Sequence, residues 1–329
     1  MKIAVVILNW NGKKLLEEFL PSVVSHSEEA TIYLADNASI DDSIDYVITR
    51  FPSVKIIRNN SNGGYAKGYN DALKQIEADV FCLLNNDVEV TKNWIHPIIT
   101  FFQENSETAI IQPKILDYKN KTHFEYAGAA GGFLDKYGYP YCRGRIFNTL
   151  EKDELQYEGV SDIFWASGAC LFIRKSIFES LGGFDESYFA HQEEIDLCWR
   201  AKNLGHQIKY VSNSVVYHLG GGTLNALNSK KTYLNFRNSL FNLTKNAKGN
   251  LFSLIIIRLK LDGIAAVKFL LSFKPNHTLA IIRAHFSFYL NLSRLLKDRK
   301  ALVQSTDYYH KHSIVWQYFV KKKTTFKSL

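Results

Sequence analysis

The stretch Phe81-Cys82-Leu83-Leu84-Asn85-Asn86-Asp87 decides the fold of this chain. A short apolar run bounded by polar residues is typical of a strand buried on both faces, so residues 85–87 lie at its carboxyl end. Open α/β sheets bind ligands at that edge. A carboxylate beside two amides suits a divalent cation, because ions such as Mg²⁺ take oxygen ligands and share them with substrate phosphates. The sequence therefore predicts a nucleoside diphosphate held through a metal ion at Asp87, although a plain Asn-Asn-Asp turn would give the same pattern.

Three more apolar runs come before this stretch, and each one ends in polar residues. Residues 3–8, 31–35 and 54–57 are predicted strands, and residues 13–25 and 66–76 are predicted helices. This alternation indicates a parallel α/β sheet with right-handed crossovers. The polar residues that then gather at the edge bearing Asp87 are Asn9, Asn11, Asp36, Asn37, Asn62, Gly63 and Gly64.

These polar residues suit a nucleotide. Asp36 is placed to accept hydrogen bonds from a base or a ribose, and Gly63-Gly64 would let backbone approach an anion at a helix start. The Gly63-Gly64 turn is not a Walker loop, since no Gly-Lys-Ser or Gly-Lys-Thr follows it, and it is not a GxGxxG pattern, so the standard NTPase and dinucleotide fingerprints are absent. A plain glycine turn remains the alternative for Gly63-Gly64.

The charge of the chain is divided unevenly. Residues 1–229 hold 21 Lys and Arg against 29 Asp and Glu, whereas residues 230–329 hold 19 against 3. Such a basic region predicts an anionic partner, either membrane phospholipid or nucleic acid. Because no nucleic-acid reader motif is present, we expect no nucleic-acid partner. The four cysteines show no CxxC spacing, and no signal peptide precedes Ile3, so we expect reduced thiols in a cytosolic protein.

Two motifs in the second half of the chain are candidates for chemistry. A predicted helix starts at Glu193-Glu194, and one of these acids could be a general base, although first-turn acids also simply cap helices. His218 ends a predicted strand and precedes Gly220-Gly221-Gly222-Thr223, so it could be a metal ligand or a structural histidine. Residues 117–160 predict a β-hairpin insertion or mobile loop, placed over an acceptor site or without a role.

Together these motifs resemble family 2 glycosyltransferases of the GT-A fold, in particular the bacterial rhamnosyltransferase-like members. The matching blocks are residues 6–12, 35–39, 62–70, 83–87, 168–174, 182–186, 193–197 and His218. The resemblance implies a nucleotide-diphospho-sugar transferase fold, with a mostly parallel central sheet covered by helices on both faces. Residues 1–229 would form this catalytic domain, and residues 230–329 a helical C-terminal extension.

The resemblance also implies roles for individual residues. Asp36 would contact the base, and Asp87 would end the family's DxD-type motif, here Asn85-Asn86-Asp87, which binds Mg²⁺ or Mn²⁺ with His218 as a further ligand. Glu194 stands where the family usually has Asp, so the base is Glu194 or Glu193, and we favour Glu194. The residues expected to hold the donor are Asn9, Asn11, Asp36, Asn37, Asn62, Gly63, Gly64, Asn70, Asn85 and Asn86.

The implied activity is inverting transfer of a sugar, with rhamnose as the candidate, from a nucleotide-diphosphate sugar. The acceptor would be a hydroxyl of a glycan or lipid-linked molecule in cell-envelope polysaccharide assembly. An inactive nucleotide-sugar-binding scaffold at the membrane is the alternative, since Asn85 and Glu194 depart from the family pattern. A nucleotidyltransferase is a poorer match, because Asn9-Trp10-Asn11-Gly12 replaces its Gly-rich, basic phosphate loop.

The basic region predicts contact with the inner face of the cytoplasmic membrane. Residues 230–329 lack strand and crossover alternation, so we expect helices throughout. Residues 251–273 form the most apolar window, but they contain charges that are expensive at a bilayer centre. An interfacial helix on anionic lipid is therefore favoured over a membrane span, and the alternative is a set of helices packed on the catalytic domain with a solvated basic face.

Overall fold

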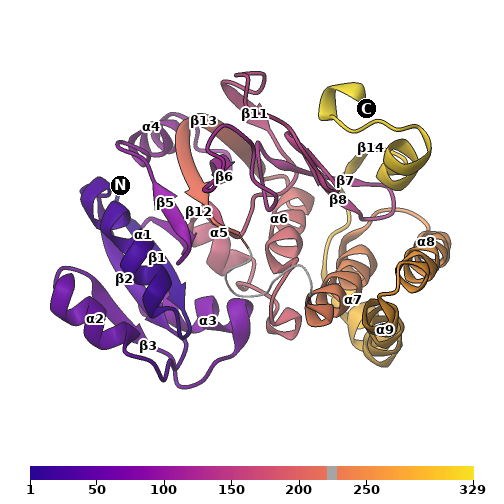
Figure 1. The fold of residues 1–329 in the computed structure, drawn as a ribbon, viewed down its shortest axis with the longest axis horizontal. Helices are drawn as coiled ribbons and strands as arrows, with labels where there is room; N and C mark the ends of the chain where they lie inside the picture. Colours follow the sequence, from indigo (N-terminus) through magenta and orange to yellow (C-terminus); the bar gives the residue numbers. More distant parts are fainter. Residues whose placement is uncertain (221–227) are drawn as a thin grey trace.

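The computed structural model describes residues 1–220 and 228–329, and a mixed sheet lies at its centre (Figure 1). The strands of this sheet are β1 (Ile3–Asn9), β2 (Ala30–Asp36), β3 (Lys55–Arg58), β4 (Val80–Asn85), β5 (Val88–Val90), β6 (Thr108–Asp117), β11 (Val160–Asp162), β12 (Cys170–Arg174) and β13 (Gln207–His218). Their order in space is β11-β13-β6-β12-β4-β1-β2-β3, and β5 pairs with β13.

The predicted parallel strands are confirmed in the N-terminal half of this sheet. β3, β2, β1 and β4 pair in parallel, and the register sets Asn9 beside Asp36. The other half is mixed, because β12 runs antiparallel to both β4 and β6. The predicted strand that ends at His218 is β13, which has an irregularity between Val211 and Val215.

Helices cover both faces of the sheet, as predicted. They are α1 (Lys13–His26), α2 (Ser43–Arg50), α3 (Gly64–Leu73), α4 (His96–Glu104), α5 (Lys175–Ser180) and α6 (Glu193–Asn203). Alternate residues of β1 point to opposite faces: Val6 packs in the core shared with α3, α5 and α6, and Val5 in the core shared with α1, α2 and α4. The predicted buried thiols are confirmed, because all four cysteines are free and buried.

A second, smaller sheet lies beside the main one. Its strands are β7 (Gly132–Asp135), β8 (Pro140–Cys142), β9 (Arg145–Ile146), β10 (Thr149–Leu150) and β14 (Tyr309–Lys311). Four of them belong to the predicted insertion at residues 117–160. The prediction that residues 230–329 are helical throughout is wrong at β14, which pairs in parallel with β7 and so satisfies the backbone groups along that edge.

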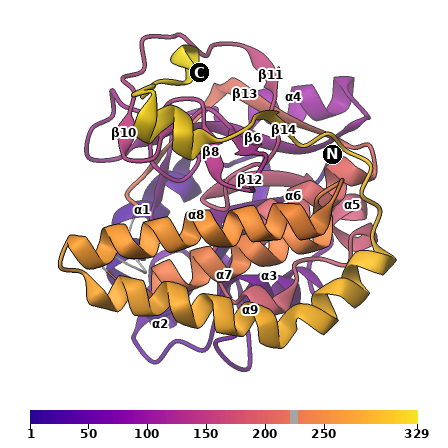
Figure 2. The ribbon, with the colours of Figure 1, turned by 90° about the vertical axis from the view of Figure 1, so that its right-hand side faces the viewer.

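The C-terminal helices form the side of the molecule that faces the viewer in Figure 2. They are α7 (Ser229–Asn246), α8 (Leu251–Leu271) and α9 (Pro275–Ala301), and short helical turns occur at η1 (Glu186–Tyr188), η2 (Trp316–Val320) and η3 (Phe326–Ser328). Every residue from Asn238 to Asn246 is buried, so α7 is a core helix between α6 and the α8–α9 pair. In the described part of the chain, no helix is both long and apolar enough to cross a membrane.

Candidate active site

Three strand ends meet around the side chain of Asn9. Asn86 Nδ2 donates to Asn9 Oδ1 at 3.0 Å, and Asn9 Nδ2 donates to Asp36 Oδ1 at 3.4 Å and to Ser39 Oγ at 3.2 Å. Asn9 and Asp36 are buried, so these polar groups are fixed by each other and not by solvent. The strand ends of β1, β2 and β4 therefore converge, as the sequence predicts, and their role in holding a donor stays a prediction.

The loops after β1 and β2 have unusual backbone conformations. Asn11 has φ 50° and Ala38 has φ 59°, in the left-handed region that non-glycine residues seldom adopt. The loops are tied together, because Asn11 N–H donates to Ser39 Oγ at 2.9 Å and Ile40 N–H donates to Asn11 Oδ1 at 2.8 Å. Backbone strain of this kind tends to gather at functional sites, where the surrounding structure maintains it.

The glycine turn before α3 is crowded by another part of the protein. Asn37 Nδ2 donates to Gly64 O at 2.9 Å and to Asn62 Oδ1 at 3.3 Å. A Cβ atom on Gly64, which has φ 80°, would lie 2.3 Å from the carbonyl oxygen of Phe189. The N–H of Tyr65 donates to that same oxygen at 2.7 Å. The close approach expected at Gly63-Gly64 is thus made by residue 189, and anion binding there stays a prediction.

Asn70 holds the loop before α6. Its Nδ2 donates to Phe184 O at 2.9 Å, and Phe184 N–H donates to its Oδ1 at 2.9 Å. Both polar atoms of the Asn70 amide thus make hydrogen bonds to the backbone of Phe184. The predicted role of Asn70 in donor binding remains a prediction.

Asp87 and His218 lie side by side, because β5, which begins next to Asp87, pairs with the end of β13. His218 Nε2 is 3.1 Å from Asp87 Oδ1 and 3.4 Å from Asn85 Nδ2, and its Nδ1 is 3.3 Å from Glu125 Oε1. Burial disfavours a charged imidazole, but the carboxylates of Glu125 and Asp87 outweigh it and raise the pKa of His218 well above its usual value.

The geometry of this pair fits a small divalent cation. Two ligands on adjacent positions of an octahedral ion, each about 2.1 Å from it, lie about 3 Å apart. Glu125 is placed to hold the other ring nitrogen of His218, as carboxylates do for metal-binding histidines. Within residues 1–220 and 228–329, no three His, Cys, Asp or Glu side chains form a complete metal cluster. Donor phosphates and water would therefore supply the remaining ligands. The predicted Gly221, Gly222 and Thr223 lie outside the described residues.

The acid pair opens α6. Glu193 is buried and Glu194 is partly exposed. Burial raises the pKa of Glu194 to about 7, and burial followed by the neighbouring Glu194 raises the pKa of Glu193 well above its usual value. Glu193 Oε2 makes no hydrogen bond within the described part of the chain. A partly exposed carboxyl with a pKa near 7 suits a general base, because such a group can take a proton near neutral pH.

Tyr65 lies between the loop before the acid pair and the end of β4. Its hydroxyl donates to Gly168 O at 2.8 Å, and the next residue, Ala169, accepts a hydrogen bond from Asn85 N–H at 3.0 Å. The Tyr65 N–H donates to Phe189 O, in the loop that leads to the acid pair. Burial raises the pKa of Tyr65 well above its usual value, and Tyr69 and then the two glutamates of the acid pair add to the rise. Tyr65 therefore joins the loop before the acid pair to the residues beside the end of β4.

The sequence alone did not point to Glu125 or to α7. Glu125 lies in the aromatic-rich insertion without a recognisable pattern. On α7, Asn238, Asn242 and Asn246 recur every four residues, and this polar stripe on a buried face was the available signal.

The profile of glycosyl transferase family 2 matches residues 4–182, more than half of the chain. The chain belongs to this family. A relative among curated proteins is the N-acetylglucosaminyl-diphospho-decaprenol L-rhamnosyltransferase of Mycobacterium tuberculosis, 25% identical over 231 residues, covering 66% of this chain and 75% of that protein. Rhamnosyltransferase WbbL of Escherichia coli K12 is 23% identical over 210 residues, covering 57% of this chain and 78% of that protein. This chain is therefore a rhamnosyltransferase-like family 2 glycosyltransferase.

Solved structures show the same GT-A fold. GalNAc-T7 with UDP, GalNAc and Mn²⁺ superimposes with a TM-score of 0.58 at 17% identity, covering 75% of this chain and 48% of that chain. The mannosyltransferase PcManGT from Pyrobaculum calidifontis, with GDP-Man and Mn²⁺, has a TM-score of 0.55 at 11% identity, covering 88% and 87%. The predicted fold class of this family 2 glycosyltransferase is thereby confirmed.

Proposed function

We propose that this glycosyltransferase transfers a sugar, with inversion at the anomeric carbon, from a nucleotide-diphosphate sugar to a hydroxyl of a lipid-linked or glycan acceptor. The observation that carries the proposal is that the site contains two pairs of side chains suited to different chemistry. The first pair, Asp87 and His218, suits the binding of a cation with a diphosphate. The second pair, Glu193 and Glu194, suits the removal of a proton. Tyr65 joins the loop before the acid pair, through Phe189 O, to Gly168, which lies next to the partner of Asn85.

The donor would lie along the ends of β1, β2 and β4. Asp36 and Asn9, already fixed by hydrogen bonds, would face the nucleoside, and Asn86 would lie between the nucleoside and Asp87. The curated relatives that are rhamnosyltransferases, one of them acting on a decaprenol-linked sugar, support rhamnose and a lipid-linked acceptor in envelope polysaccharide assembly. Solved neighbours hold UDP or GDP-Man, which supports a nucleoside diphosphate as the leaving group.

The acid pair would act on the acceptor. The Glu194 carboxylate takes the proton from the acceptor hydroxyl, and the hydroxyl oxygen forms a bond to the anomeric carbon from the side opposite the diphosphate. The bond from that carbon to the phosphate oxygen breaks, and its electron pair leaves with the nucleoside diphosphate. Glu193 lies beside Glu194, and burial raises the pKa of both carboxyls, that of Glu194 to about 7, which matches this base to neutral pH.

A divalent cation is part of this proposal. Asp87 and His218 would hold Mg²⁺ or Mn²⁺, and Glu125 would orient the imidazole through its other ring nitrogen, Nδ1. The bound cation would neutralise charge on the departing diphosphate.

A panel of donors tests the proposed function. UDP-N-acetylglucosamine, dTDP-L-rhamnose and GDP-mannose are added with and without MnCl₂, and thermal unfolding is followed, since a bound ligand raises the apparent Tm by mass action. We expect one donor to raise Tm in the presence of Mn²⁺ and to be slowly hydrolysed. No shift with any donor would contradict the proposal, and a shift without any release of nucleoside diphosphate would favour the inactive scaffold.

We also propose that α8 and α9 rest on an anionic membrane surface. The two helices form a hairpin whose outer side faces the viewer in Figure 2. Large apolar side chains are exposed along it: Ile257, Ile264, Val267, Leu270, Leu271, Phe273, Leu279, Ile282, Phe286 and Leu290. We call these residues the outer apolar face. Ile255 and Leu259, which lie in the predicted interfacial window of residues 251–273, pack against the protein.

The charges around the outer apolar face favour lipid over a second copy of the chain. Residues 251–301 contain nine Lys and Arg and only two acids, Asp262 and Asp298. Asp262 is buried in an ion pair with Arg258 at 2.8 Å, so it does not offset the basic surface. Two such faces would repel each other, whereas apolar side chains flanked by bases suit anionic phospholipid.

Co-sedimentation with vesicles tests this surface. Phe273→Ser combined with Leu290→Ser removes two of the most exposed apolar side chains, which are 94% and 86% exposed. We expect the double variant to lose most of its binding to phosphatidylglycerol-containing vesicles, and the wild type to bind them more tightly than pure phosphatidylcholine. Leu155→Ser, 70% exposed on the insertion, is the matched control. Equal binding by wild type and double variant would contradict the proposal.

A further inference from the structure

The loop that leads into the acid pair, residues 187–192, is held almost entirely by side chains of α7. We call it the pre-helix loop. Arg237 Nη2 donates to Ser187 O at 3.0 Å and to Tyr188 O at 2.9 Å. Asn238 Nδ2 reaches the carbonyls of residues 188, 190 and 191 at 3.2, 3.0 and 2.6 Å. Asn242 Nδ2 donates to Gln192 O at 3.1 Å. Five of the six carbonyls in the loop therefore accept from α7.

The remaining carbonyl joins the loop to the donor side. Phe189 O accepts from Tyr65 N–H at the first turn of α3, at 2.7 Å. The pre-helix loop thus lies between α7, the glycine turn before α3 and the start of α6. A displacement of the loop would move the acid pair relative to the donor side of the site.

The loop needs such support because its backbone is strained. Phe189 has φ 65° and ψ −62°, and Ala190 N–H donates to Tyr188 O at 2.8 Å, which makes a γ-turn of the rare, strained type. His191 and Gln192 follow with φ 69° and 73°, and Glu193 comes next. Non-glycine residues in these regions are strained and persist only where neighbouring groups fix them.

The side chains of α7 that donate these hydrogen bonds are themselves held in place. Asn238 is fully buried, and its Oδ1 accepts from Arg237 Nε at 2.8 Å. Asn242 Oδ1 accepts from Tyr188 Oη at 2.7 Å. The next turn of the helix adds Lys245, which pairs with Asp185 at 2.8 Å and with Asp196 of α6 at 3.0 Å.

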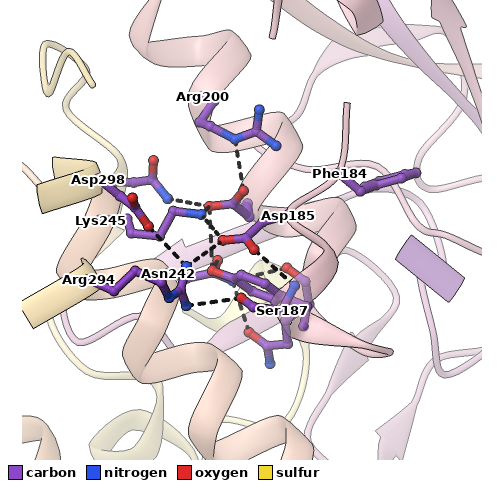
Figure 3. A network of polar contacts seen from close by, with 12 residues as sticks. Phe184, Asp185, Ser187, Arg200, Asn242, Lys245, Arg294 and Asp298 are labelled. Carbon is purple, nitrogen blue, oxygen red and sulfur yellow. Dashed lines mark hydrogen bonds and ion pairs between the residues drawn. The ribbon is translucent and has the colours of Figure 1, made fainter. Parts of the chain in front are cut away.

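Figure 3 shows this polar network, in which α7 and α9 converge on the start of the loop. Arg294 of α9 donates to Ser187 Oγ at 3.0 Å and lies 3.4 Å from Asp185 Oδ2. Burial alone would raise the pKa of Asp185, but Lys245 outweighs it and keeps that pKa well below its usual value. The network therefore stays ionised, and it anchors both sides of the loop.

We infer that Asn238 is a positioning residue for the reaction, which sets the acid pair in place by fixing the strained pre-helix loop. Arg237 and Asn242 assist it on either side. The inference rests on the proposed function of the acid pair. It also means that α7 serves the reaction centre, although it lies outside residues 4–182 that carry the family match.

Asn238→Ala tests the inference. The variant removes the side-chain hydrogen bonds of α7 to the carbonyls of residues 190 and 191, and leaves that of Tyr188 to Arg237. We therefore expect kcat to fall about 100-fold, as a misplacement of roughly 1 Å can produce. The KM for the donor should change much less, and the pH midpoint of kcat should move. Ser239→Ala is the matched control: Ser239 is the next residue, is buried, and bonds to Gly138 O and Arg258 instead of the loop.

Two further measurements keep the test decisive. Hydrogen exchange over residues 187–198 should speed up in Asn238→Ala and stay unchanged in Ser239→Ala, and this readout does not depend on any donor. Arg237→Met, at a partly exposed position, should show the same changes in weaker form if Asn238→Ala does not fold. Unchanged kcat, pH midpoint and exchange in the variants, or equal losses in Ser239→Ala, would overturn the inference. Absence of transfer by the wild type, with altered exchange in Asn238→Ala, would count against the proposed function alone.

Discussion

His218 Nε2 lies 3.1 Å from Asp87 Oδ1, although 131 residues separate the two along the chain. The pairing of β5 with β13 brings them together at one edge of the sheet. Both side chains are buried, and both face the place where the donor diphosphate is proposed to lie.

This relationship predicts a cation site that depends on both residues. His218→Ala should weaken Mn²⁺ binding strongly, because it removes one of two protein ligands. Binding is measured by the loss of the free Mn²⁺ signal in electron paramagnetic resonance, with UDP present to supply phosphate oxygens. His285→Ala is the control, since His285 pairs with Asp262 on the outer helices. Equal Mn²⁺ affinity in wild type and His218→Ala would rule out His218 as a ligand.

Glu125→Gln should act on the cation through His218. Its carboxylate lies 3.3 Å from His218 Nδ1, and the loss of such a partner typically weakens metal affinity about 10- to 100-fold. Isothermal titration with MnCl₂ in the presence of UDP measures the change. Glu151→Gln in the same insertion is the control, and an unchanged affinity in Glu125→Gln would show that the contact does not orient the imidazole.

The pH dependence of turnover should follow the acid pair. A general base must be deprotonated, so activity should rise as pH increases through about 7, the pKa of Glu194. Glu194→Gln should lower kcat by about 10²- to 10⁴-fold while donor binding persists. If Glu194→Gln turns over normally and Glu193→Gln does not, the base is Glu193. A kcat that does not change between pH 5 and 9 would exclude both Glu193 and Glu194 as the general base.

The same carboxyl should make stability depend on pH. The folded state raises the pKa of Glu194, so folding favours the protonated form and loses this contribution as pH rises from the unfolded value through about 7. Glu194→Gln cannot ionise and should be more stable than wild type at pH 8. The gain should be on the order of 1 kcal/mol, since solvent screens a partly exposed group. Urea unfolding at pH 5 and pH 8 measures it, and a gain that shrinks with pH would contradict the sign.

Gly64→Ala should disturb the contact between α3 and the pre-helix loop. A Cβ atom there would meet Phe189 O at 2.3 Å, in addition to the positive φ. Gly182→Ala is the control, because Gly182 also has positive φ but open space around it. We expect both variants to lower Tm, and only Gly64→Ala to lower kcat strongly. Equal kcat in both would show that the contact does not matter for turnover.

The sequence predicts much of the fold because local patterns carry it. Apolar runs such as residues 3–8 and 81–84 are typical of buried strands, and in a parallel sheet the polar residues after them share an edge. β14 could not be predicted, because its three residues gain their partners only from β7, far away in the chain. The sequence indicated that Asp87 and His218 could share a site, and the two lie 3.1 Å apart. Glu125 was not predictable, because only tertiary packing places it beside His218.

The basic region, residues 230–329, shows the same limit of prediction from sequence. Its basic composition was visible in the sequence, but the support that α7 gives to the pre-helix loop depends on backbone carbonyls of residues 187–192, which no sequence pattern displays. Likewise, the apolar residues of α8 could be counted, but which of them face the protein is visible only in the fold, where Arg258 and Asp262 of the same helix are buried as an ion pair.

A crystal structure with Mn²⁺ and the donor selected by the panel tests the central claim most directly. The account predicts the diphosphate and the cation at Asp87 and His218, and the carboxyl of Glu194 on the opposite side of the anomeric carbon. A donor bound with its anomeric carbon turned away from Glu194 and Glu193, or a cation bound away from Asp87, would contradict it.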